Sequence, residues 1–186
     1  MKELLNRLRI GVLLVLMAFS GIASGDCPEW LNHSVKRLHS SESVNLCEEF
    51  ADKPLLIVNT ASHCGFTPQF TALEAMYQEY GEKGIGFLGV PSNSFFQEAS
   101  SEEKAADVCF VNYGVSFTML SPIDVTGRDA HPLFKALAQQ SSAPKWNFYK
   151  YVVDRNGRVK GRFSSMVKPD DPKITELLDE LITQTD

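Results

Sequence analysis

Residues 54–90 read PLLIVNTASHCGFTPQFTALEAMYQEYGEKGIGFLGV, two apolar runs joined by a longer segment with helical spacing. The first run, 55–60, is apolar and β-branched and follows a proline, which is typical of a buried strand. Residues 67–83 repeat apolar side chains every three or four positions after a Thr-Pro start signal, which predicts a helix. The second run, 85–90, again predicts a buried strand. The stretch therefore predicts a β-α-β unit with parallel strands.

The remainder of the chain extends this unit on both sides. Residues 34–39 alternate in part and are compatible with a hairpin strand, while an Asp-Arg-Asn-Gly turn separates two further strands. Apolar spacing and start signals predict three more helices. The predicted elements are helices at 101–113, 132–139 and 174–182 and hairpin strands at 149–153 and 158–164. A parallel half followed by an antiparallel hairpin predicts an α/β protein with a mixed central sheet flanked by helices on both faces, the thioredoxin-like fold.

Composition limits the class of protein. The chain has 186 residues, 44% hydrophobic and 22% charged, values that suit one globular domain. The net charge of −5 argues against a nucleic-acid partner, because phosphate binding needs a basic face. We divide the chain into residues 1–25, an N-terminal extension at 26–50 and the main domain at 51–186.

The first 25 residues have the order of a secretory signal peptide. Lys2, Arg7 and Arg9 precede the uncharged apolar run 10–19, and small residues follow at 21–25. Cleavage is expected after Ala23 or Gly25. An uncleaved membrane anchor is the alternative, although the apolar run is short for a spanning helix of about 20 residues. We expect an exported protein, periplasmic or secreted, without stable membrane association after cleavage.

Of the four cysteines, Cys64 is in the most informative position. It lies in a polar turn between the strand 55–60 and the helix 67–83, where the positive end of the helix dipole favours a thiolate. A buried structural cysteine is the alternative. Thr67 occupies the position where a disulfide reductase carries its second cysteine. A single thiolate of this kind is suited to attack a peroxide and become a sulfenic acid. No two cysteines are separated by two residues and the histidines do not cluster with them, so no metal is expected.

The sequence around Cys64, NTASHCGFTPQ at 59–69, resembles the active-site signature of the glutathione peroxidase family. Two more stretches match the family, LGVPSN at 88–93 running to Gln97 and Glu98, and KWNF at 145–148. The resemblance implies a thioredoxin-like fold, reduction of hydrogen peroxide or organic hydroperoxides without a cofactor, and a catalytic tetrad. The tetrad comprises Cys64 as the nucleophile with Gln97, Trp146 and Asn147 as hydrogen-bonding partners. The loop before Gln97 is one residue shorter than the family pattern, with Phe96 alone between Phe95 and Gln97.

Cys109 falls in the predicted helix 101–113, as in the subgroup of the family that resolves the sulfenic acid with a second cysteine. The resemblance implies that a thioredoxin-like protein restores the thiols, with glutathione as the alternative reductant, and that local unwinding lets the two sulfurs meet. A core-facing cysteine with no redox role is the simpler interpretation. The short segment between Ala136 and Lys145 lacks the insertion that builds the tetramer of many animal members, so a monomer is expected.

Cys27 and Cys47 flank the N-terminal extension at a separation that suits a structural disulfide in an oxidising compartment, and two free thiols are the alternative. Two other functions compete with a thiol peroxidase. One is a redox relay that passes oxidation from Cys64 and Cys109 to a partner protein. The other is a thioredoxin-like disulfide oxidoreductase, which the missing Cys-x-x-Cys disfavours.

Overall fold

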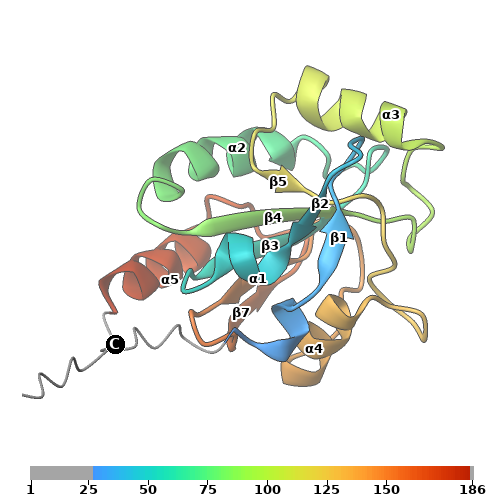
Figure 1. Cartoon of the computed structure of the whole chain (residues 1–186). Coiled ribbons are helices and arrows are strands. Elements are labelled where there is room, and N and C mark those ends of the chain that lie inside the picture. The colour runs from blue at the N-terminus through green and yellow to red at the C-terminus, as the bar shows by residue number, and fades with distance from the viewer. Residues whose placement is uncertain (1–26, 185–186) are drawn as a thin grey trace, which may run out of the picture.

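The computed structural model describes residues 27–184, so the predicted signal peptide and its cleavage site lie outside the described residues. A five-stranded sheet in the order β5-β4-β3-β6-β7 forms the centre (Figure 1). β3 pairs in parallel with β4, and β4 with β5, whereas β6 and β7 run antiparallel to their neighbours. This arrangement confirms the predicted mixed sheet. The strands are β3 (Leu55–Thr60), β4 (Gly86–Pro91), β5 (Thr118–Met119), β6 (Lys150–Val153) and β7 (Val159–Phe163).

Helices cover both faces of the sheet, as the sequence predicted. The helices are α2 (Gln69–Tyr80), α3 (Glu102–Ala106), α4 (Pro132–Gln140) and α5 (Pro172–Thr183). The side chains of β3 alternate between the faces, so that Leu56 and Val58 pack with α2 and α5 while Leu55 and Ile57 pack with α4. Figure 1 shows α2 and α4 on opposite sides of these strands. No helix among residues 27–184 is both long and apolar enough to cross a membrane.

The helix after Cys64 is shorter than its periodicity predicted. It begins at Gln69, because the amides of Thr67 and Gln69 donate to carbonyls three residues earlier and form tight turns first. It ends at Tyr80, where the Ile85 amide donates to the Tyr80 carbonyl at 3.0 Å and Gly84 adopts a φ of +92°. Cys64 therefore precedes the helix by a turn segment.

The predicted helix 101–113 changes type along its length. Ser101 caps α3 by accepting a hydrogen bond from the Lys104 amide at 3.3 Å. From Asp107 to Asn112 the backbone widens into a π-helix, here η2. This short π-helical segment carries Cys109 on its buried side and Val111 on its exposed side. Segments of this type are rare and frequently occur at functional sites.

The N-terminal segment packs against the main sheet. It forms η1 (Glu29–Leu31), β1 (Ser34–Lys36), β2 (Ser43–Asn45) and α1 (Leu46–Phe50). The Leu38 amide donates to the Met119 carbonyl at 2.9 Å and the Ser121 amide donates to the Lys36 carbonyl at 2.8 Å, so the segment borders the edge strand β5. A Cys27–Cys47 disulfide with a Cα–Cα distance of 5.9 Å fixes the start of the segment to α1, in agreement with the expected bridge.

Candidate functional site

Cys64 lies just beneath the surface in the middle of the connection between β3 and α2. Its side chain is 6% exposed and belongs to the cluster of buried residues between the sheet and α2 and α5. The cysteine carries no disulfide. Cys64 is therefore almost completely enclosed, with only a small part of the residue exposed to solvent.

Thr67 fixes the turn that holds Cys64. The Cys64 amide donates to the Thr67 hydroxyl oxygen at 3.1 Å. That oxygen also lies 2.7 Å from the Cys64 carbonyl oxygen and 2.9 Å from the Ala61 carbonyl oxygen, and its proton can be donated to either. Thr67, which stands where a disulfide reductase carries its second cysteine, therefore stabilises the turn through its hydroxyl group.

The loop after β4 brings Gln97 to this turn. The His63 amide donates to the Gln97 carbonyl at 2.9 Å, which ties the loop to the residue next to Cys64. Phe96 lets the shortened loop close by adopting a φ of 59°, in the left-handed region that glycine usually fills. Its side chain is 90% exposed, so packing does not compensate for this conformation. With Phe96 in this conformation, the Gln97 side chain reaches its hydrogen-bond partner.

Asn147 is that partner. Its side-chain amide donates to Gln97 Oε1 at 3.0 Å, so the structure brings Gln97 and Asn147 together. Asn147 is fully buried and its Oδ1 has no hydrogen-bond partner among the described residues. An unpaired buried acceptor costs about 1–3 kcal/mol, which a bound donor would recover.

Trp146 lies next to Asn147 but remains 41% exposed. Its ring contacts Phe95, with centroids 5.5 Å apart, so it rests on the loop that carries Gln97. Among residues 27–184 no hydrogen bond joins Gln97, Trp146 or Asn147 to the Cys64 sulfur. The structure brings Gln97 and Asn147 into contact, with Trp146 beside them in the chain, and the placement of these three residues as partners of the Cys64 sulfur stays a prediction.

Asn59, at the end of β3, holds the segment 146–149 in place. Its side-chain amide donates to the Trp146 carbonyl at 3.1 Å and its Oδ1 accepts from the Tyr149 amide at 3.1 Å. The Phe148 amide also donates to the Asn59 carbonyl at 2.6 Å. Sequence reasoning assigned Asn59 no role of its own. The available signal was an amide side chain near the end of an apolar run predicted to be a buried strand, where a polar group needs hydrogen-bond partners.

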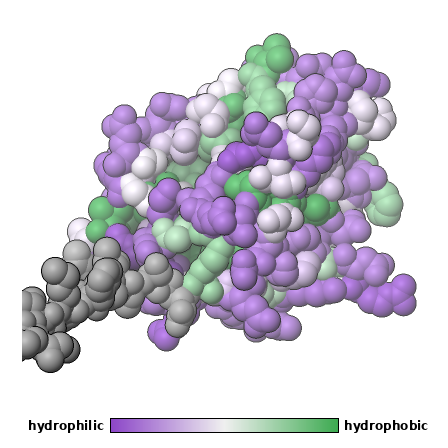
Figure 2. Space-filling model, viewed as in Figure 1, coloured by the Kyte–Doolittle hydropathy of each residue, from purple (hydrophilic) through white to green (hydrophobic). Residues whose placement is uncertain are grey.

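Cys109 is the second free cysteine, and it lies in the same buried cluster as Cys64. Burial raises the pKa of its thiol to about 12, and the negative charge of Glu98 adds to the increase. Phe110 and Val111, its neighbours on η2, are exposed. Figure 2 shows a largely hydrophilic face with apolar surface at the top of the view, over the α3 region. Cys109 is therefore a protonated, inward-facing thiol in an irregular helix.

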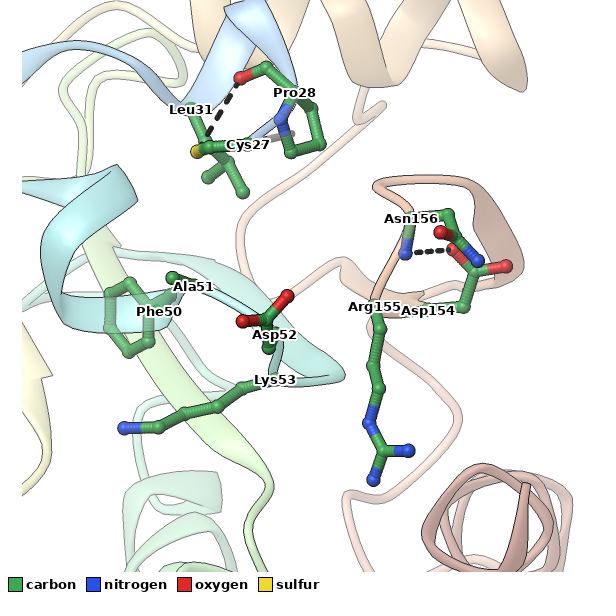
Figure 3. Close-up of a pocket in the computed structure, with 10 residues that line it drawn as sticks. All are labelled: Cys27, Pro28, Leu31, Phe50, Ala51, Asp52, Lys53, Asp154, Arg155 and Asn156. Atoms are coloured by element: carbon green, nitrogen blue, oxygen red, sulfur yellow. Dashed lines mark hydrogen bonds between the residues drawn. The ribbon is translucent and has the colours of Figure 1, made fainter. Parts of the chain in front are cut away.

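Two cavities differ in size and in their distance along the chain from Cys64. A small cavity of about 70 Å³ lies between the N-terminal segment and the β6–β7 turn, lined by Cys27, Asp52 and Arg155 among others (Figure 3). It contains none of the predicted catalytic residues. A larger, open groove of about 580 Å³ begins two residues after Cys64 and is lined by Phe66, Pro68, Ala72, Met166 and Lys168 among others. No group of three His, Cys, Asp or Glu side chains in the described part of the chain could hold a metal ion.

The fold and the site define a class of protein, a thioredoxin-fold oxidoreductase with one cysteine at the junction of β3 and α2. Residues 31–138 match the family model of glutathione peroxidase. The chain is 41% identical over 146 residues to the glutathione peroxidase-like peroxiredoxin HYR1 of Saccharomyces cerevisiae, covering 75% of this chain and 88% of that protein. It is 44% identical over 142 residues to the glutathione peroxidase homolog BsaA of Bacillus subtilis, covering 73% and 86%. The crystal structure of Trgpx in its apo form superposes with a TM-score of 0.65 at 33% identity, covering 83% of this chain and 95% of that one. The chain therefore belongs to the glutathione peroxidase family.

Proposed function

We propose that this protein is a thiol peroxidase in which Cys64 reduces hydrogen peroxide or organic hydroperoxides. The Cys64 thiol loses its proton, the resulting thiolate attacks one peroxide oxygen, and the O–O bond breaks. The proton goes to the departing oxygen, so the products are a Cys64 sulfenic acid and water or an alcohol. The observation that carries the proposal is the Gln97–Asn147 hydrogen bond beside the Cys64 turn, with the buried Asn147 Oδ1 left unpaired. A peroxide hydroxyl is a hydrogen-bond donor of the kind that this oxygen lacks.

Cys109 then resolves the sulfenic acid in this proposal, and a thioredoxin-like protein or glutathione restores both thiols. Two observations support a resolving role. Cys64 and Cys109 belong to one buried cluster, and Cys109 lies in the π-helical segment, whose opening would release it. The similarity to a protein named a peroxiredoxin also favours a thiol-based cycle. The Cys27–Cys47 disulfide supports an exported protein in an oxidising compartment.

The test is peroxide consumption by the purified full chain, with hydrogen peroxide or cumene hydroperoxide as substrate. A thioredoxin system and a glutathione system supply electrons in separate assays. Cys64→Ser should abolish turnover in both assays, because the serine hydroxyl stays protonated and is a weak nucleophile towards O–O bonds. Cys109→Ser is the matched control, since it removes the other free thiol and should retain one oxidation per chain. Turnover by Cys64→Ser at the wild-type rate would contradict the proposal.

A further inference from the structure

The two oxygens of the Glu98 carboxylate differ in their hydrogen bonds among the described residues, since Oε1 accepts several and Oε2 accepts none. Its Oε1 accepts hydrogen bonds from the Ala99 amide at 2.7 Å, the Ser62 amide at 3.3 Å and the Ser62 hydroxyl. Within residues 27–184 no hydrogen bond reaches Oε2. The side chain is therefore held rigidly in place while one carboxylate oxygen stays available to a further donor.

This carboxylate is bonded to the turn that carries Cys64, and its neighbour Ala99 packs on the cluster that contains both free thiols. Ser62, which holds Oε1, is two residues before Cys64, and Gln97, which precedes Glu98, is bonded to His63. Ala99, which follows Glu98, packs against the cluster that contains both Cys64 and Cys109. The negative charge of Glu98 also adds to the increase in the pKa of the Cys109 thiol, after the larger effect of burial. One anchored carboxylate is thus linked to the Cys64 turn and to the cluster that holds both sulfurs of a resolution step.

Resolution requires the Cys109 thiol to lose a proton. Because burial raises the pKa of this thiol to about 12, almost none of it is a thiolate near neutral pH as long as Cys109 stays buried in η2. Burial also raises the pKa of Glu98, against the lowering effects of the Ser62 hydrogen bonds and of His63. A carboxylate with a raised pKa is a better proton acceptor than an exposed one.

We propose that Glu98 accepts the proton of the Cys109 thiol as Cys109 attacks the sulfenic acid of Cys64. The inference rests on the resolving role of Cys109 proposed above. The Cys109 S–H bond and the Cys64 S–O bond break, and the S–S bond forms. The Cys64 sulfur is reduced and the Cys109 sulfur is oxidised. The proton passes from Glu98 Oε2 to the departing hydroxide, which leaves as water, and the carboxylate is restored.

The experiment measures the resolution step directly. The reduced full chain receives one equivalent of hydrogen peroxide, and mass spectrometry of quenched samples follows the Cys64 sulfenic acid and the Cys64–Cys109 disulfide. Glu98→Gln is the informative variant, since its amide oxygen can keep the bonds to Ser62 and Ala99 but cannot accept a proton. Glu103→Gln makes the same chemical change on the exposed side of α3 and is the control. We expect Glu98→Gln to slow disulfide formation relative to sulfenic acid formation by about a hundredfold, and Glu103→Gln to leave the ratio unchanged.

The pH profile separates a proton acceptor from a purely structural residue. The wild-type resolution rate should fall as the pH drops through the raised pKa of Glu98, and this decline should be absent in Glu98→Gln. Two results would overturn the role of Glu98 without affecting that of Cys109. One is a wild-type profile without the decline, and the other is disulfide formation in Glu98→Gln within twofold of the wild-type rate. If the wild-type chain forms no Cys64–Cys109 disulfide, the resolving role of Cys109 and the role of Glu98 both fail.

Discussion

Lys150 provides a direct test of the packing, because it is a charged residue with a fully buried side chain. It lies on β6, and its ammonium group donates to the Val167 carbonyl at 2.6 Å. Burial lowers the pKa of Lys150 from its ordinary value of 10.5 to about 7. A pKa difference of this size means that holding the charged ammonium group in the folded state costs roughly 5 kcal/mol. Lys150→Met should remove this cost but leave the Val167 carbonyl unpaired, at about 1–3 kcal/mol.

The sign of the pH dependence follows from the protons that each state binds. Between pH 7 and 10.5 the unfolded chain holds the Lys150 proton and the folded chain does not, so rising pH stabilises the folded wild type. The free energy of unfolding of the wild type should therefore increase by about 2.5 kcal/mol from pH 6 to pH 9 relative to Lys150→Met. The variant should be more stable than wild type by about 2–4 kcal/mol at pH 6, and nearly equal to it at pH 9.

Urea denaturation at pH 6, 7.5 and 9, followed by circular dichroism, measures these differences. Lys160→Met on the adjacent strand β7 is the matched control, because Lys160 is exposed. It should shift stability little and equally at each pH. A stability difference between wild type and Lys150→Met that does not change with pH would refute the reasoning. It would mean that the ammonium group reaches water in solution.

Three further substitutions test the site. Trp146→Phe should retain the fold and lower the peroxidase rate by about tenfold or more in steady-state assays, because the ring stays and the N–H donor is lost; a wild-type rate would make Trp146 only a packing residue. Cys109→Ser should let Cys64 accumulate as sulfenic and then sulfinic acid under repeated peroxide, seen by mass spectrometry, and thioredoxin-supported turnover should collapse; normal turnover would indicate a one-cysteine mechanism. Phe96→Gly should stabilise the fold by about 1 kcal/mol in urea titrations, because glycine has no Cβ and adopts a φ of 59° without strain. A destabilised variant would show that Phe96 makes contacts beyond its loop.

The sequence predicted the elements with strong periodicity and located their ends less well. The two central strands, α2 and α5 all lie where the apolar spacing placed them, because long amphipathic or fully apolar runs admit few alternatives. β5 has only two residues and forms through pairing with β4, so no local pattern marked it. The π-helical form of 107–112 was equally inaccessible, since side-chain spacing over six residues does not distinguish it from an α-helix.

The candidate site was predicted as a set of residue types but not as a network. The motifs around Cys64, Gln97 and Asn147 were found in the sequence, yet their connections run through backbone groups that no motif displays. The His63–Gln97 bond and the clamp made by Asn59 are examples. The buried Lys150 was missed for a related reason, since a single lysine at the start of an apolar strand is expected to face water.

The central sheet separates the two free cysteines from the disulfide. Cys64 and Cys109 pack on the face covered by α2 and α5, whereas Cys27 packs with the cluster on the opposite face. Exchange between thiols and disulfides needs the attacking sulfur to reach the bonded pair, and five strands of hydrogen-bonded backbone lie between the two sets. In the proposed cycle the chain therefore keeps its Cys27–Cys47 bridge while Cys64 and Cys109 change oxidation state. Scrambling between the pairs would require the sheet itself to open.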